Sequence, residues 1–292
     1  MSLRPQFARP RSLGQAVALL ETLSAGAVLI AGGQELMPHV NYGRLMPAVF
    51  VDISGLSELK GIREEGGRIS IGALCSHHEL QRDALVGAFL PLLACAAAQI
   101  GGGRQVHNRG TVGGNIVSMH PLYDIVPTLI ALHADVQIAG AGGNRCVPLA
   151  SLVHETSHGL GNSAILTRVL ITPQAAGEGW SYHKLKATDG SYASANTAAR
   201  VMLDPAGGFG SLDVVTGAVS ERPIDASGAL AQLLRGQTPE AVTMRQAEQL
   251  CSSLVLQPLA DHQGGADYRV AMAGVVARRA IEEAYRMADG RR

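Results

Sequence analysis

The sequence predicts an α+β protein with two domains. Its 292 residues, 47% of them hydrophobic, are enough to fill two cores. Up to Thr172, short extended and helical patterns alternate with short connections, whereas after Pro173 three extended segments are followed by helices. The run from Pro173 to Gly179 has the composition of a linker. We therefore expect a domain boundary near Pro173, with an antiparallel sheet and helices in the second domain.

Charge and hydropathy exclude several classes of function. The formal net charge is zero and no block of Lys or Arg stands out, so the electrostatic pattern of a nucleic-acid binder or of a protein bound to anionic membranes is missing. The first residues contain no apolar signal-peptide core, and no later apolar run is long enough to span a bilayer. We therefore expect a soluble, cytoplasmic protein with no membrane span.

Metal binding is not expected either. No two of the four cysteines approach the C-x-x-C spacing of a zinc knuckle or an iron–sulfur cluster. The segment His154–His158 does match H-E-x-x-H, the zinc-binding pattern of metalloproteases. However, Gly159 and Gly161 follow directly and disfavour the stable helix that this pattern needs, so we expect a surface connection. The cysteines are Cys75, Cys95, Cys146 and Cys251, which we expect to be buried thiols.

The first elements are predicted from capping and apolar spacing. Ser12 with Gln15 fits a capping box, and apolar residues then recur at helical spacing. Ala27–Ile30 is typical of a short strand, and it ends in the turn Gly32-Gly33. Such a turn exposes backbone N–H groups at the end of a sheet, which suits a phosphate, although an ordinary turn fits as well. Further extended segments are expected at Val49–Ile53 and Arg68–Ser76, with a turn-like Ser57–Gly67 between them.

The most unusual stretch runs from Ile100 to Pro127. So dense a set of glycines lets backbone N–H groups converge on an anion, which indicates a loop suited to phosphate. The stretch lacks the strand, G-x-G-x-x-G and helix of a Rossmann turn, and it has no G-x-x-x-x-G-K-[ST]. A glycine-rich connection without a ligand therefore remains an alternative. The glycines are Gly101, Gly102, Gly103, Gly110, Gly113 and Gly114.

The remaining elements follow from periodicity and turn residues. Before the boundary, the sequence predicts a helix at Thr128–Ala134, an extended Asp135–Ala139, a turn-rich Ala139–Pro148 and a strand at Ile165–Thr172. After it, an antiparallel meander is expected at Trp180–Ala187, Ala195–Leu203 and Ser211–Val219. Helices are expected at Ala226–Leu234, Pro239–Leu250 and Ala266–Met287.

Five motifs occur along the chain in a characteristic order. Ala31–Pro38 has the form A-G-G-x-x-L-x-P, and Asn108–Asn115 has the form N-R-G-T-x-G-G-N, followed by P-x-x-D-x-x-P at Pro121–Pro127. Tyr182–Asn196 contains Y-x-K, and Gly264–Ala284 begins with G-G-A-x-Y-R, close to the pattern G-S-A-x-Y-R. Together, over nearly the whole chain, they resemble the FAD-binding medium subunit of molybdenum hydroxylases, the family of xanthine dehydrogenase and aerobic carbon monoxide dehydrogenase.

The resemblance implies two domains and one cofactor. Residues 1–174 would form a PCMH-type FAD-binding domain, and residues 175–292 a CO dehydrogenase flavoprotein-like C-terminal domain, again α+β. The two glycine motifs would hold the FAD diphosphate, Asp124 would hydrogen-bond the cofactor, and Lys184 would approach the isoalloxazine. Val117 and Leu166 would lie near the ring or the adenosine. The residues implied to contact FAD are Ala31, Gly32, Gly33, Gln34, Glu35, Leu36, Thr111, Gly113, Gly114, Asn115, Val117, Asp124, Leu166 and Lys184.

The resemblance also implies a function in electron transfer. The chain would be the oxidoreductase subunit that takes electrons from a [2Fe-2S] small subunit and passes them through FAD to NAD, quinone or oxygen. A molybdopterin-binding large subunit would oxidise the organic substrate, so no catalytic acid or base is implied in this chain. Two alternatives stay open: a stand-alone PCMH-type flavin oxidase, and a redox-inactive nucleotide-binding assembly subunit.

Overall fold

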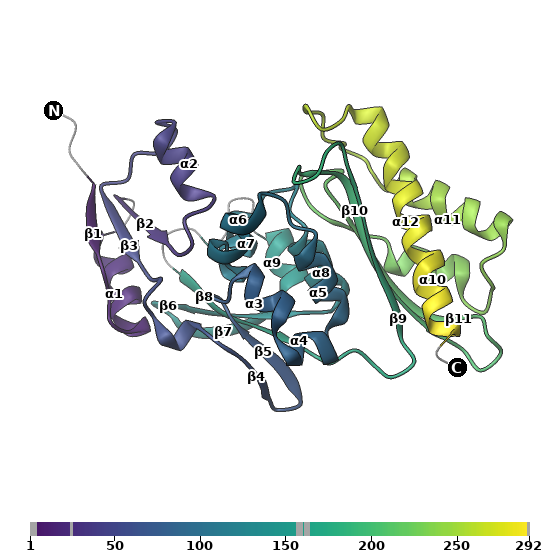
Figure 1. The fold of residues 1–292 in the computed structure, drawn as a ribbon, viewed down its shortest axis with the longest axis horizontal. Coiled ribbons are helices and arrows are strands. Elements are labelled where there is room, and N and C mark those ends of the chain that lie inside the picture. Colours follow the sequence, from purple (N-terminus) through teal and green to yellow (C-terminus); the bar gives the residue numbers. More distant parts are fainter. Residues whose placement is uncertain (1–4, 24–25, 156–159, 161–163, 291–292) are drawn as a thin grey trace. The chain divides into compact units, whose positions relative to one another are not determined.

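The chain folds into two compact units, and segments of its first half alternate between them. The structure is a computed structural model that describes residues 5–23, 26–155, 160 and 164–290 (Figure 1). Unit 1 comprises Met1–Leu85, Gly103–Met119 and Ala134–Thr172, and unit 2 comprises Val86–Gly102, His120–His133 and Pro173–Arg292. Two segments that precede the expected boundary therefore belong to unit 2. The division at residue 174 remains a prediction.

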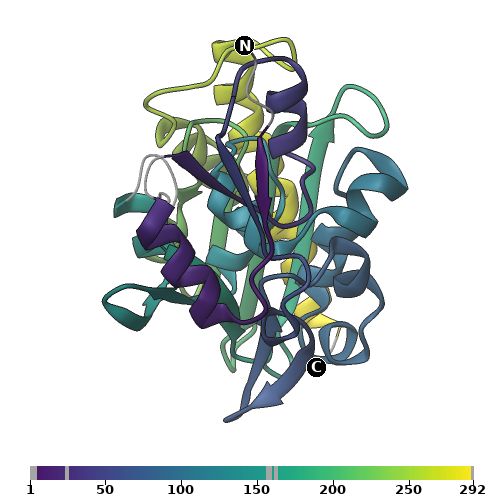
Figure 2. The same ribbon diagram turned by 90° about the vertical axis from the view of Figure 1, so that its left-hand side faces the viewer.

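Unit 1 begins with a small parallel sheet. Its strands are β1 (Gln6–Ala8), β2 (Ala27–Ile30) and β3 (Val49–Asp52), in the order β1-β3-β2. Helix α1 (Leu13–Leu23) lies beside this sheet (Figure 2) and contributes Ala16 and Leu20 to a core that contains Ala27 and Val51. Buried apolar residues on one face of α1 thus fix the sheet whose middle strand ends at Asp52.

A second sheet of unit 1 has five antiparallel strands in the order β4-β5-β8-β6-β7. The inner strands carry fully buried residues such as Ile71, Val136 and Val169. Both outer strands lie in segments expected to be turns, because their side chains are mostly exposed and polar and show no apolar alternation. The bounds are β4 (Ile62–Glu65), β5 (Arg68–Gly72), β6 (Asp135–Gly140), β7 (Gly143–Pro148) and β8 (Ala164–Ile171).

Short helices connect the strands of unit 1. The glycine-rich stretch that was expected to be a loop contains two whole helices, α6 and α7, both in this unit, so that part of the expectation is wrong. The helices of unit 1 are α1, α2 (Leu36–Asn41), α3 (His77–Arg82), α6 (Gly103–Arg109), α7 (Val112–Ser118) and α9 (Leu149–Glu155), with a 3₁₀ turn at Ser57–Leu59. Helix α4 (Ala84–Phe89) spans the point where the chain leaves unit 1.

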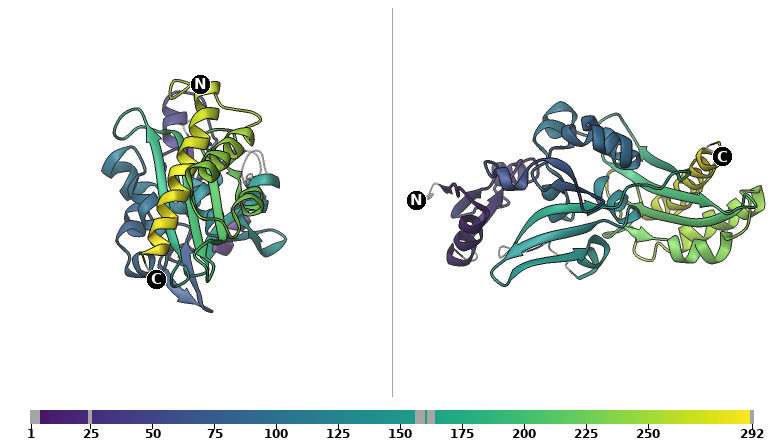
Figure 3. Two further views of the ribbon diagram at one scale, coloured as in Figure 1. Left: turned by 90° about the vertical axis from the view of Figure 1, so that its right-hand side faces the viewer. Right: turned by 90° about the horizontal axis from the view of Figure 1, so that it is seen from below.

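Unit 2 is built on the predicted antiparallel meander. Its sheet has the order β12-β11-β10-β9, and the long helix α12 packs on β9 and β10 (Figure 3). Helix α8 contacts β10 and β11, and all seven of its residues are buried. The bounds are β9 (Gly179–Lys186), β10 (Ala193–Leu203), β11 (Phe209–Gly217), β12 (Ile224–Asp225), α5 (Pro91–Ala98), α8 (Ile125–Ala131), α10 (Ser227–Leu234), α11 (Ala241–Ser253) and α12 (Ala266–Asp289). In the part of the chain that the structure describes, no helix is both long and apolar enough to cross a membrane.

Candidate functional site

The segment Ala31–Leu36, here called the first segment, connects β2 to α2 in unit 1. The carbonyl of Ile30 accepts a hydrogen bond from Ile53, which ends the pairing of β2 with β3. Gly33 then adopts φ +72°, in the left-handed region that favours glycine, and its carbonyl accepts from Met37 at the start of α2. Among the described residues, none accepts a hydrogen bond from the backbone N–H of Gly32, Gly33 or Gln34. Three consecutive donors are thus available to a ligand.

The first segment lies directly against the end of α6. A Cβ atom added at Gly32 would overlap the backbone carbonyl of Arg109. Only glycine permits this approach, because any side chain would push the two backbones apart. The motifs at Ala31–Pro38 and Asn108–Asn115, far apart in the sequence, are therefore neighbours within unit 1.

The second segment, Thr111–Asn115, forms the first turn of α7. Thr111 is the N-cap residue, and its Oγ1 accepts from the N–H of Gly114 at 3.1 Å. The N–H of Val112 donates to Cys75 (2.9 Å), and the N–H of Gly113 donates to Ala73 (2.8 Å). The N–H of Asn115 makes the first intrahelical bond, to Thr111. The four N–H groups from Val112 to Asn115 are therefore already used inside the protein, unlike those of Gly32, Gly33 and Gln34.

Close packing explains several glycines of the central stretch. A Cβ at Gly113 would lie 2.7 Å from the Cβ of Ala73, and one at Gly110 would lie 2.8 Å from the ring of His77. In unit 2, a Cβ at Gly101 would overlap the carbonyl of Gly190. These glycines let neighbouring elements meet, a role that their spacing in the sequence did not distinguish from phosphate binding.

Side chains of α7 and β8 supply the other groups expected near the cofactor in unit 1. Asn115 is only 7% exposed, and its Oδ1 has no hydrogen-bond partner in the described structure. A buried acceptor without a partner costs about 1–3 kcal/mol, so this atom is suited to accept from a ligand. Val117 is half-buried on α7, and Leu166 is buried on β8, which α7 contacts.

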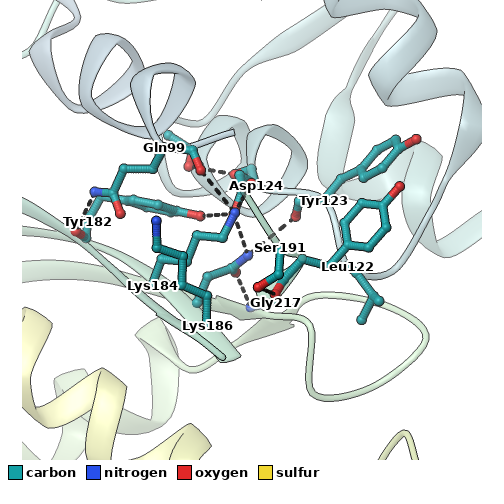
Figure 4. A network of polar contacts seen from close by, with 12 residues as sticks. Gln99, Leu122, Tyr123, Asp124, Tyr182, Lys184, Lys186, Ser191 and Gly217 are labelled. Carbon is teal, nitrogen blue, oxygen red and sulfur yellow. Dashed lines mark hydrogen bonds and ion pairs between the residues drawn. The ribbon is translucent and has the colours of Figure 1, made fainter. Parts of the chain in front are cut away.

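Asp124 and Lys184 meet in a buried polar cluster of unit 2 (Figure 4). The Nζ of Lys184 lies 2.7 Å from Asp124 Oδ2 and donates to the carbonyl of Gln99 at 3.0 Å. The side chain of Lys184 is 0% exposed and that of Asp124 5%. The hydroxyl of Tyr182 donates to Asp124 Oδ1 at 2.5 Å, and the Nδ2 of Asn196 donates to the same atom at 3.2 Å. Three side chains thus share one carboxylate.

Burial and charge act in opposite directions in this cluster. Burial raises the pKa of Asp124, while the Lys184 ammonium and the hydrogen bonds from Tyr182 and Asn196 lower it. Burial, followed by the nearby Asp124 carboxylate, raises the pKa of Tyr182 well above 10, so its hydroxyl stays a donor. Tyr182 and Asn196 were not expected as site residues, although both lie in the segment that carries the Y-x-K motif.

His77 is a buried residue that the motifs did not indicate. It is the first residue of α3, directly after the N-cap Ser76 that forms a capping box with Glu79, and its backbone N–H donates to the carbonyl of Gly110. Burial lowers the pKa of its imidazole to about 4. The ring therefore stays neutral at physiological pH, directly beneath the turn that leads into the second segment.

The H-E-x-x-H pattern falls partly outside the described residues. His154 and Glu155 end α9, whereas His158 is not among the residues that the structure describes. Within the described ranges, no group of three or more His, Cys, Asp or Glu side chains is arranged to hold a metal ion. The assignment of this pattern to a surface connection stays a prediction.

Comparisons with known proteins cover nearly the whole chain. The family model for the FAD binding domain in molybdopterin dehydrogenase matches residues 3–174, and the model for the CO dehydrogenase flavoprotein C-terminal domain matches residues 180–284. The carbon monoxide dehydrogenase medium chain of Hydrogenophaga pseudoflava is 36% identical over 97% of both chains. That of Afipia carboxidovorans is 32% identical over 95% of this chain and 96% of the relative.

A solved structure agrees with these relatives. The carbon monoxide dehydrogenase from Hydrogenophaga pseudoflava that lacks the Mo-pyranopterin moiety of its molybdenum cofactor contains a similar chain. The TM-score is 0.92 at 33% identity, and the match covers 98% of this chain and 99% of the other. The predicted α+β fold is therefore confirmed over nearly the whole chain.

Proposed function

This chain belongs to the family of FAD-binding medium subunits of molybdenum hydroxylases, and we propose that it works as the electron-transfer subunit of a heteromeric complex. It is an oxidoreductase flavoprotein, and its cofactor is FAD. Its partners in this proposal are a molybdopterin-binding large subunit and a [2Fe-2S] small subunit. Electrons arrive from the [2Fe-2S] subunit and leave to NAD, quinone or oxygen.

The three free N–H groups of the first segment carry this proposal. Consecutive backbone donors at the end of a strand suit an anion, and the FAD diphosphate is the anionic part of the cofactor. The left-handed Gly33 and the packing of Gly32 on Arg109 fix these donors in place. The residues present therefore fit the group that the family implies.

Other residues would hold the rest of the cofactor. We assign the diphosphate to Ala31–Leu36 and a hydroxyl or amine of FAD to the unpaired Oδ1 of Asn115. Thr111, Gly113 and Gly114 would support this contact through the fold of α7, and Val117 and Leu166 would contact apolar parts. Asp124 and Lys184 stay proposals that rest on the resemblance.

FAD supplies the redox chemistry, because it exchanges electrons with one-electron and two-electron partners. This chain's residues supply binding, orientation and electrostatics. Nothing in the site requires a general acid or base from the protein. The substrate of the complex would react on the large subunit, so this chain does not determine which compound is oxidised.

Purification of the native complex tests the proposal. We expect the chain to co-purify with two other subunits, with iron and molybdenum in the complex and FAD on this chain. Reduction of the iron–sulfur subunit should bleach the flavin absorbance within the catalytic cycle time. A chain that purifies alone and oxidises its own organic substrate would instead identify a stand-alone flavin oxidase, and one that binds FAD without reducing it would identify an assembly subunit.

Two further expectations are tested with the same material. Cell fractionation should place the complex in the cytoplasm; recovery in the periplasm would contradict that location.

Limited proteolysis should cut near the expected boundary at residues 174 and 175 before it cuts within either part.

A further inference from the structure

The charges around the first segment are unfavourable for an anion. Glu35 lies within this segment, with its Oε1 3.2 Å from the Nε2 of His39. Asp52 ends β3 level with Ile30, and its carboxylate contacts Arg9 at 3.2 Å. Glu35 directly follows the three free N–H groups in the chain, and Asp52 is in register with the residue two positions before them. These N–H groups carry only partial positive charge. Because Arg9 and His39 already contact these two acids, a further cation would strengthen the binding of a diphosphate there.

Arg109 is a cation next to this segment, and its side chain has no partner among the described residues. It is the last residue of α6 and exposed, and its backbone carbonyl touches the position where Gly32 would carry a Cβ. Its guanidinium makes no hydrogen bond or ion pair with any residue that the structure describes. A long, flexible side chain that starts at this point can reach an anion held by the N–H groups of Gly32 to Gln34.

We propose that Arg109 is the counter-charge of the FAD diphosphate. A guanidinium presents a planar fork of donors that matches phosphate oxygens, and charge-assisted hydrogen bonds of this kind are stronger than those between neutral groups. The close packing of Gly32 on Arg109 would then serve two purposes: it brings the donors of the first segment and the cation of α6 to one anion. The inference rests on the proposed placement of the diphosphate at Gly32–Gln34.

FAD titration of the full-length apoprotein tests this role. Arg109→Gln should weaken FAD binding at least tenfold, measured by quenching of flavin fluorescence, and Arg109→Lys should weaken it less because the charge remains. The affinity of Arg109→Gln should also depend less steeply on salt concentration. ADP carries the same diphosphate. Its affinity, measured by competition with FAD, should therefore fall by the same factor in Arg109→Gln.

Arg104 offers a matched control on the same helix. It is exposed and, in the described part of the chain, has neither a hydrogen bond nor an ion pair, but it has no contact with Gly32. Arg104→Gln should keep the wild-type affinity within twofold. Equal losses of FAD affinity in the two variants would show that only the overall positive charge of the protein matters, which would contradict the proposal. An unchanged affinity of Arg109→Gln would also refute it. Failure of the wild type to bind ADP would instead contradict the placement of the diphosphate.

Discussion

The two glycine motifs of unit 1 differ in what their backbone N–H groups do. In the first segment, the N–H groups of Gly32, Gly33 and Gln34 have no acceptor among the described residues. In the second segment, the N–H groups from Val112 to Asn115 all donate to other parts of the protein. A glycine cluster therefore indicates a ligand only where its donors are left over. Where they are used, the glycines allow elements to pack closely.

The Asp124–Lys184 pair resembles the second segment in this respect, because its polar groups are satisfied inside the protein. Lys184→Met should therefore lower the free energy of unfolding by about 3–5 kcal/mol, since it leaves a buried carboxylate without its cation. Urea unfolding measures this change. Lys186→Met is the control: Lys186 pairs with the fully exposed Asp189, so its loss should lower stability far less than the loss of Lys184. Similar small effects in both variants would show that the buried pair is not a structural element.

The second segment rests on His77, whose pKa of about 4 makes stability depend on pH. Its usual pKa is 6.5, so between pH 6.5 and 4 the unfolded chain binds a proton that the folded chain does not. Stability should fall by about 3 kcal/mol as pH drops through this window. His77→Phe should remove this contribution, seen as a flatter plot of unfolding free energy against pH. An unchanged plot would mean that the buried ring does not resist protonation.

A Cβ atom in the second segment should affect the fold more than the ligand. Gly113→Ala should destabilise the chain by roughly 1–3 kcal/mol, because the new methyl group would meet Ala73 at 2.7 Å. Flavin bound per folded molecule should stay near the wild-type value at saturating FAD. Gly114→Ala, which meets only Thr111 Oγ1, should be milder. Loss of flavin from a fully folded Gly113→Ala protein would contradict the assignment of this glycine to packing.

The first segment should show the opposite pattern. Gly33→Ala must place an alanine at φ +72°, which costs roughly 1–2 kcal/mol of stability or a shift of the segment. Because the N–H groups of the first segment are the proposed anion donors, the affinity for FAD should fall at least tenfold. Equilibrium dialysis with FAD measures this, with Gly14→Ala as the control, since a Cβ there has open space. Unchanged affinity would remove the first segment from the cofactor site.

The sequence predicted the elements whose side chains are buried in a regular pattern. The strands β2, β3 and β8 and the meander after Gly179 were expected near their observed positions. The outer strands β4 and β7 were missed because their exposed polar residues follow no apolar alternation. Helices α6 and α7 of the glycine-rich stretch were missed because glycine is a poor helix former, and packing overrides that preference here.

The candidate site was predictable in its first segment and less so elsewhere. A strand that ends in Gly32-Gly33 is a local feature, so the free donors could be expected from the sequence. The acceptors that use the N–H groups of Val112 and Gly113 are Cys75 and Ala73, nearly forty residues earlier, and no spacing reveals them. Likewise, the cluster of Asp124 depends on strands β9 and β10, which follow it much later in the chain.

The interleaving of the two units sets the order in which the chain can fold during synthesis. Unit 1 is complete once Thr172 has left the ribosome, whereas α8 emerges before β10 and β11, the strands that cover it. Until those strands are made, α8 can pack on α5, but its seven buried residues lack the sheet that covers them in the finished protein. The nascent chain therefore carries an aggregation-prone segment between two parts of a finished unit, and a fragment ending at residue 174 would carry it permanently.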